Sequence, residues 1–292
     1  MSGFDREGQE RGSPVLIALI MAAVGFFMYM TQTETNPVTG IKQHITLSPA
    51  QEIRLGLEAT HQMVSQMGGE IPRSDPRSQE VIKIGQELVS RTIAQKGPWH
   101  YQYHLLADPK TVNAFALPGG QIFITLGLLN QLETEAQLAG VLAHETGHVI
   151  ERHSAEQMAK NQLGKILIVA TGIGAADPNH PSRAKQAAAV ASLVNQVTQL
   201  RYSRKDELEA DEWGLRLMTE AGYDPRAMLQ VMDILQQATP GGHTPEMLLT
   251  HPYPAHRIQE INAYLEKHPP QRNLSQGRNL KQIFSESSHK IQ

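Results

Sequence analysis

The 292-residue sequence contains no cysteine. This absence excludes disulfide bonds, a thiolate metal site and a thiol nucleophile, so any metal site has to be built from histidine and carboxylate side chains. Thirteen histidines are available for that purpose. Aromatic residues are also few, at 5%, but hydrophobic residues make up 40% of the chain, which is typical of a protein with a packed core.

The sequence also lacks an excess of charge of either sign. Its 26 lysines and arginines oppose 29 aspartates and glutamates, which gives a net charge of −3. Proteins that bind nucleic acid usually carry a basic patch that neutralises phosphates. We therefore expect no nucleic acid among the partners.

One long hydrophobic run, at 14–30, carries no charge. A helix of this length measures about 25 Å, near the shortest that crosses a hydrocarbon core of about 30 Å. We predict a transmembrane signal-anchor; a cleaved signal peptide and a buried core helix are the alternatives. Arg6 and Arg11 precede the run and Lys42 is the first basic residue after it. This asymmetry predicts a cytoplasmic tail at 1–13 and a body on the extracytoplasmic, periplasmic side of the membrane.

The rest of the chain divides into a linker at 31–47, a domain at 48–268 and a polar C-terminal tail at 269–292, which we expect to be poorly ordered. Hydrophobic periodicity within the domain predicts mainly helices and a small β-sheet, an α+β fold. Helices are expected at about 48–67, 75–95, 134–162, 205–221, 225–237 and 254–267, and strands at 99–106 and 121–125.

Two further apolar segments, at 163–176 and 186–200, are each too short to cross a membrane. We expect core helices joined by a loop near the cleft. A pair of helices that faces the membrane and presents substrates from it is the alternative.

The predicted helix at 134–162 contains His144-Glu145-Thr146-Gly147-His148. Two histidines four residues apart lie on one face, one turn apart, so both imidazoles can bind the same Zn²⁺. The neighbouring glutamate, Glu145, can act as a general base toward a metal-bound water. The alternative is a helix with two surface histidines, but the apolar neighbours Val141, Leu142, Val149 and Ile150 indicate a buried helix.

A hydrolytic zinc site needs a third protein ligand. Ser154 stands where the metzincin pattern has its third histidine, so the ligand has to be a carboxylate from another helix. Glu207 and Asp211 are four residues apart and share one face of a predicted helix. One can bind the metal while the other accepts a hydrogen bond from a ligand histidine. Ala210, between them, would let this helix pack closely on the first.

These motifs resemble the M48 family of gluzincin metallopeptidases, which includes membrane-linked bacterial quality-control proteases and the CAAX prenyl endopeptidases. The resemblance spans about 45–268. It rests on His144-Glu145-x-x-His148, on Glu207-x-x-x-Asp211 within residues 203–214, and on the flanking segments 113–120 and 251–258.

The resemblance implies a zincin-like metallopeptidase domain with an active-site helix, an edge strand and one Zn²⁺ per subunit. It implies His144, His148 and Glu207 as metal ligands, Glu145 as catalytic base and Asp211 as the proton donor. Our reading of Asp211 from the residues alone is different: a carboxylate that accepts an N–H from a ligand imidazole.

The resemblance also implies roles for two flanking segments. The strand 121–125 resembles the edge strand on which gluzincins bind an extended peptide by backbone pairing; a plain core strand is the alternative. Its residues are Gln121, Ile122, Phe123, Ile124 and Thr125. His251 resembles a histidine that reaches the zinc and blocks the water position, so it is a candidate switch or transition-state residue; a surface histidine is the alternative.

The expected function is a membrane-anchored, zinc-dependent endopeptidase of protein and peptide substrates, including misfolded or membrane proteins, in envelope protein quality control. Glu145 would take a proton from the attacking water and deliver it to the leaving amine. A non-enzymatic alternative keeps the fold and the zinc but acts as a chaperone or scaffold. Its cleft would be held shut by His251 or by the loop 171–185.

Overall fold

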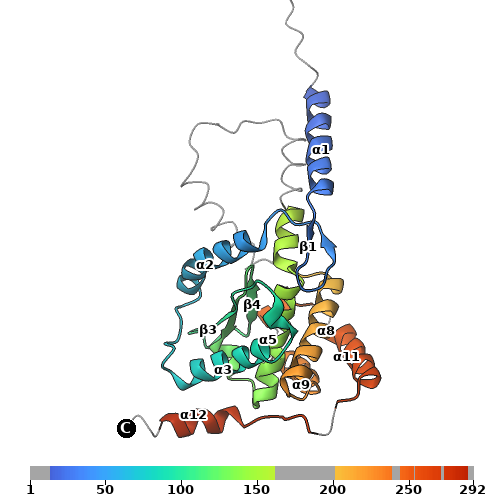
Figure 1. The fold of residues 1–292 in the computed structure, drawn as a ribbon. Helices are drawn as coiled ribbons and strands as arrows, with labels where there is room; N and C mark the ends of the chain where they lie inside the picture. The colour runs from blue at the N-terminus through green and yellow to red at the C-terminus, as the bar shows by residue number, and fades with distance from the viewer. Residues whose placement is uncertain (1–13, 162–200, 239–243, 253, 271–272, 289–292) are drawn as a thin grey trace, which may run out of the picture.

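A computed structural model gives the fold (Figure 1) and describes residues 14–161, 201–238, 244–252, 254–270 and 273–288. The apolar segments at 163–176 and 186–200 and the loop 171–185 lie outside these ranges. The mainly helical chain with small sheets confirms the predicted α+β class. The helices are α1 Pro14–Thr31, α2 Pro49–Gln66, α3 Pro76–Ser90, α4 Leu126–Leu129, α5 Glu135–Ile150, α8 Arg204–Ala221, α9 Ala227–Gln237, α10 Glu246–Thr250, α11 Pro254–Lys267 and α12 Leu280–Ser288, with a 3₁₀ helix at Ile93–Lys96. The strands are β1 Glu34–Thr35, β2 Lys42–Gln43, β3 Gln102–Leu106, β4 Ala114–Leu117 and β5 Gln121–Thr125.

Helix α5 lies at the centre of the domain, and all of its residues are buried. It packs against α8 and α9 on one side and against α3 and β4 on the other (Figure 1). A helix that neighbours cover completely can carry apolar residues on every side. This burial explains the many alanines and leucines of the active-site helix predicted from the sequence.

The main sheet has three strands in the order β3-β5-β4. Strand β5 pairs in parallel with β3 and antiparallel with β4, in register from Ala114 opposite Ile124 to Leu117 opposite Gln121. The prediction that residues 121–125 form the edge strand is therefore wrong, because both sides of β5 are hydrogen-bonded. Among the described residues, β4 is the edge strand next to α5.

Both ends of α5 are capped by segments that the sequence suggests are only a tail and a linker. At the N-terminus, the backbone N–H groups of Glu135 and Ala136 donate to the carbonyls of Arg278 and Gln276. These two residues belong to the predicted C-terminal tail, so residues 273–288 are docked rather than poorly ordered. They supply acceptors for helix-terminal N–H groups that have no partner within the helix.

At the C-terminus of α5, the hairpin β1–β2 within the predicted linker 31–47 supplies the caps. The side-chain amide of Asn36 donates to the carbonyl of Ile150 at 2.7 Å, and that of Gln43 donates to the carbonyl of Glu151 at 2.6 Å. The linker is therefore part of the packed domain.

The single long helix predicted at 134–162 is interrupted. Helix α5 ends at Ile150, and the chain is helical again over 153–161. Between them Arg152 has a φ of 60°, a left-handed conformation that residues with a side chain rarely adopt. Nothing in the local composition marks this break, because the contacts at the turn come from residues far away in the chain.

Helix α1 covers the hydrophobic run predicted as a membrane anchor. Among the residues that the structure describes, no helix has the length and hydropathy needed to cross a membrane. The anchor stays a prediction.

Candidate metal centre

Helices α5 and α8 approach each other closely at small residues. A Cβ atom added at Gly147 would lie 2.9 Å from the carbonyl oxygen of Ala210 and 2.9 Å from Cβ of Trp213. A Cβ at Gly214 would lie 3.3 Å from the backbone nitrogen of His144. The predicted close packing at Ala210 is confirmed, and it brings the acidic face of α8 against the two histidines of α5.

Four buried side chains converge at this contact: His144 and His148 from α5, Glu207 from α8, and His251 directly after α10. Nε2 of His144 lies 3.1 Å from Nε2 of His148. The carboxylate oxygens of Glu207 lie 3.6 and 3.5 Å from these two nitrogens. Ligand atoms that surround one zinc tetrahedrally at about 2.0–2.1 Å are separated by about 3.3 Å. The spacing of the three donor groups fits zinc.

His251 fits the same spacing as a fourth donor. Its Nδ1 lies 3.3 Å from Nε2 of His144 and 3.0 Å from Oε1 of Glu207. A hydrolytic zinc site keeps its fourth position for water or substrate. In this structure His251 Nδ1 lies where that open position is expected.

Glu145 lies beside this cluster, and both of its carboxylate oxygens are buried without a hydrogen-bond partner among the described residues. The imidazole of His251 lies close to it, with Nε2 at 3.6 Å from Oε1. Burial raises the pKa of Glu145, and the nearby His251 and His144 offset part of that rise. A buried carboxyl without a hydrogen bond is unfavourable by itself, so the site is complete only with another polar group beside Glu145.

Asp211 contacts His144 on the side of the imidazole ring that faces away from the donor cluster. Its Oδ1 lies 2.9 Å from Nδ1 of His144, so the carboxylate fixes the tautomer in which Nδ1 carries the proton and Nε2 faces the donor cluster. This contact agrees with our reading of Asp211 from the residues alone.

Arg257 is a side chain of this centre that the sequence motifs did not indicate. It is buried on α11, donates through Nε to Oδ2 of Asp211 at 2.7 Å, and places Nη1 2.7 Å from Oε2 of Glu207. Burial raises the pKa of both carboxyls, but the guanidinium charge, together with hydrogen bonds and the nearby histidines, more than offsets it and holds each pKa below its usual value. The only sequence signal was its place in the segment 251–258, which carried the family resemblance.

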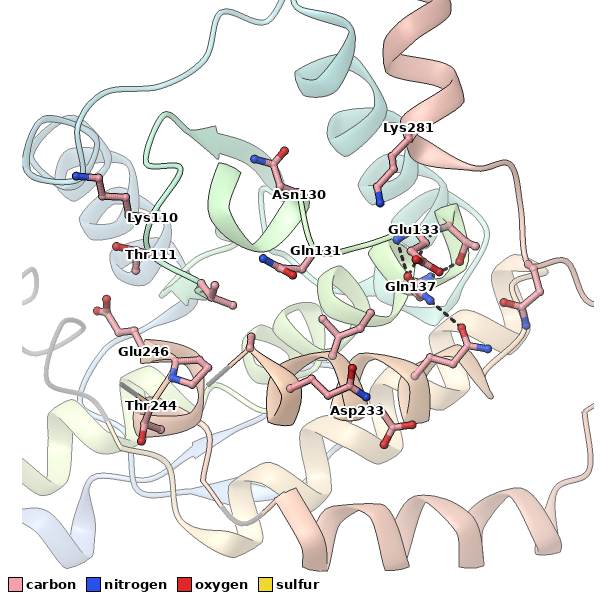
Figure 2. Close-up of a pocket in the computed structure, with 18 residues that line it drawn as sticks. Lys110, Thr111, Asn130, Gln131, Glu133, Gln137, Asp233, Thr244, Glu246 and Lys281 are labelled. Carbon is pink, nitrogen blue, oxygen red and sulfur yellow. Dashed lines mark hydrogen bonds between the residues drawn. The ribbon is translucent and has the colours of Figure 1, made fainter. Parts of the chain in front are cut away.

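A cavity of about 1300 Å³ opens on a different part of the domain (Figure 2). Its lining is polar and includes Asn130 and Gln131 after α4, Gln137 at the start of α5 and Glu246 at the start of α10. Nε2 of Gln137 donates a hydrogen bond there to Oε1 of Gln230 at 2.8 Å. None of the converging donors lines this cavity, so it is separate from the candidate metal centre.

The sequence matches the family model of Peptidase family M48 over residues 75–265. The chain belongs to peptidase family M48. The match covers every element that contributes a donor to the centre, and it confirms the family that the motifs indicate.

Curated relatives of this M48 chain include two kinds of protease. The chain is 32% identical over 257 residues to the beta-barrel assembly-enhancing protease of Escherichia coli (strain K12). The aligned residues make up 84% of this chain and 51% of the relative. It is 30% identical over 257 residues to the mitochondrial metalloendopeptidase OMA1 of Schizosaccharomyces pombe, covering 87% and 73%. The OMA1 of Saccharomyces cerevisiae is 28% identical over 278 residues, covering 88% and 76%. The chain thus spans about half the length of the bacterial relative.

The contact at Gly147 gives a test of the centre. Alanine is the better helix former, but its Cβ would overlap the backbone of α8, so Gly147→Ala should push the helices apart. We expect a loss of stability of about 1–3 kcal/mol and a zinc affinity about tenfold or more lower. Thermal unfolding and competition with a chelator measure the two effects.

Gly140→Ala, on the same helix, is the matched control. There the added Cβ meets only the Met218 and Met228 side chains, at 3.6–3.7 Å. We expect unchanged zinc affinity and a gain of up to about 1 kcal/mol. If Gly147→Ala behaved like this control, the close contact would not be what positions the donors.

Proposed function

We propose that the chain is a zinc-dependent endopeptidase that hydrolyses protein substrates. The observation that carries the proposal is the tetrahedral spacing of His144, His148 and Glu207 beside the unpartnered carboxyl of Glu145. His144, His148 and Glu207 would hold one Zn²⁺. When bound in such a site, zinc polarises the scissile carbonyl and lowers the pKa of a bound water.

Glu145 is proposed as the general base. It takes a proton from the attacking water and delivers it to the nitrogen of the leaving amine. Its buried carboxyl has a raised pKa, chiefly because of burial, which favours a group that first accepts and then donates a proton.

Asp211 is proposed to orient His144 rather than to donate a proton. Both of its oxygens are already engaged, one with His144 and both with Arg257. The lowered pKa of Asp211 supports the same role, because a carboxyl that stays ionised has no proton to give.

The substrate is proposed to bind along β4 rather than along residues 121–125. The N–H of Thr125 donates to the carbonyl of Asn113, so the alternate residues Ala114 and Ala116 direct their backbone groups away from β5. The hydroxyl of Ser154 donates to the carbonyl of Ala116 at 3.3 Å, which agrees with a carbonyl that points away from β5. An extended peptide paired with this edge would be read mainly by its backbone, which suits a broad range of protein substrates.

The setting is proposed to be a membrane, with α1 as the anchor and the domain on its extracytoplasmic side. Large apolar side chains of α1 are exposed, among them Leu19 at 63% and Phe27 at 68%. The name of the bacterial relative, a beta-barrel assembly-enhancing protease, supports work in envelope protein quality control.

A second candidate function is a latched M48 protein that binds zinc and protein partners without cleaving them. The specific observation in its favour is His251 Nδ1 in the fourth donor position. A permanent ligand there would leave no room for the attacking water.

Glu145→Gln tests the proposed base. The full chain in detergent should keep one zinc, because the ligands are unchanged, and should cleave casein about 100-fold more slowly or worse, because no base remains. Glu207→Gln should lower both the rate of cleavage and the zinc affinity, because it changes a proposed ligand. Exposed Glu212 on α8 offers a control, since Glu212→Gln should alter neither. Equal cleavage by the wild type and Glu145→Gln would rule out the mechanism.

His251→Ala separates a latch from a catalytic role. If His251 blocks the fourth position and the open state is populated at about 10% or less, its removal should raise casein cleavage about tenfold or more. His268→Ala, at an exposed position directly after α11, should have no effect. A loss of cleavage in His251→Ala would instead indicate that His251 assists the reaction. No cleavage by any variant, with zinc bound, would favour the non-enzymatic candidate.

A further inference from the structure

We infer that His153 is a positioning residue for the metal ligand His148, through a hydrogen-bond chain that ends at Glu209. The inference rests on the proposed function, because it takes His148 to be a ligand. Nδ1 of His148 lies 2.9 Å from Nδ1 of His153, and Nε2 of His153 lies 3.3 Å from Oε2 of Glu209. Both histidines are buried.

Only one arrangement of protons satisfies every contact in this chain. Nε2 of His148 faces His144 and Glu207, so it has to be free of a proton to bind a metal. The proton of the neutral imidazole then sits on Nδ1 and is donated to Nδ1 of His153. His153 in turn carries its proton on Nε2 and donates it to the carboxylate of Glu209. The chain therefore fixes the tautomer of His148 that leaves Nε2 available.

The backbone is arranged to bring His153 back against α5. The left-handed turn at Arg152 ends the helix and redirects the chain immediately before His153. The Arg152 guanidinium holds this turn in place: Nε donates to Oε1 of Glu52 at 2.9 Å and Nη2 donates to the carbonyl of Leu47 at 2.8 Å. A buried arginine in an unfavourable conformation indicates that the turn is specified by its surroundings.

The ring of His148 is held on its face as well as at its edge. The ring of Tyr202 stacks on it, with centroids 3.9 Å apart and planes 24° apart. The Tyr202 hydroxyl forms a 3.1 Å hydrogen bond with the hydroxyl of Ser154, the residue that follows His153. The segment after Arg152 thus supports His148 from two directions.

A second metal site at His153, Asp206 and Glu209 is the competing explanation, because donor atoms of these three residues lie within 4.8 Å of one another. Their contacts argue against it. Glu209 is paired with Lys205 at 2.9 Å, and Oδ2 of Asp206 accepts the N–H of Ser203 at 2.9 Å. A cation at that position would compete with an ammonium group already present.

The two proposed ligand histidines therefore differ in the group that accepts a hydrogen bond from Nδ1. A carboxylate backs His144 and an imidazole backs His148, whereas a carboxylate, a carbonyl or water is the usual partner. An uncharged acceptor fixes the orientation of His148 without adding negative charge to the centre.

The test is Co²⁺ binding by the full-length protein in detergent, followed by visible absorption and by competition with a chelator. His153→Leu removes both hydrogen bonds and should lower Co²⁺ affinity about 10–100-fold and change the visible spectrum. His153→Gln can accept from His148 and donate to Glu209, so it should restore affinity to within about threefold of the wild type. His268→Leu is the control and should match the wild type.

Glu209→Ala is the substitute test if His153→Leu fails to fold. Glu209 is the last residue of the hydrogen-bond chain and is partly exposed, so its replacement should disturb folding less. It should lower affinity about three- to tenfold, and Glu209→Gln should largely retain it. Wild-type affinity in His153→Leu, or in Glu209→Ala where the leucine variant does not fold, would overturn the inference. So would a second Co²⁺ equivalent that is lost with His153. If the wild type bound no Co²⁺, the proposed function itself would fail.

Discussion

The close approach of α5 and α8 is the constraint on which the rest of the site depends. Donors from two helices can share one metal only if every donor atom lies within about 2.0–2.1 Å of the same point. Gly147 provides the space, because it has no side chain where Ala210 and Trp213 lie against it. The caps on both ends of α5 then fix where this contact falls along the helix.

Charge balance supports a cation at this centre. Glu145, Glu207 and Asp211 are all buried, and Arg257 is the one arginine or lysine in contact with them among the described residues. Burial lowers the pKa of His251, but Glu207 and Glu145 raise it overall, so a protonated His251 can offset one negative charge. With all three carboxyls ionised and the histidines neutral, two negative charges remain unbalanced in a medium of low dielectric constant, which is unfavourable. A divalent cation held by His144, His148 and Glu207 would neutralise them. This charge balance therefore supports the proposed metal ion.

The sequence predicts the parts of the site that depend on local spacing. The histidine pair and the acidic pair follow from helix periodicity. A hydrolytic zinc site needs a third protein ligand, and this requirement connects the two pairs. The edge strand β4 was missed because its Ala114–Leu117 segment has no β-branched residue. The role of Arg257, the caps from Asn36 and Gln43, and the turn at Arg152 were missed because each depends on contacts with residues far away in the chain. Periodicity carries no information about such contacts.

X-ray absorption at the zinc edge of the full-length protein would test the central claim most directly. The account predicts one zinc per chain with nitrogen and oxygen ligands at about 2.0–2.1 Å. Two of these ligands are the imidazoles of His144 and His148; a third imidazole that is lost in His251→Ala would identify the latched state, because His251 lies at the fourth donor position. A wild type that binds no zinc, or one whose zinc keeps the same ligands after His148→Gln, would contradict the account.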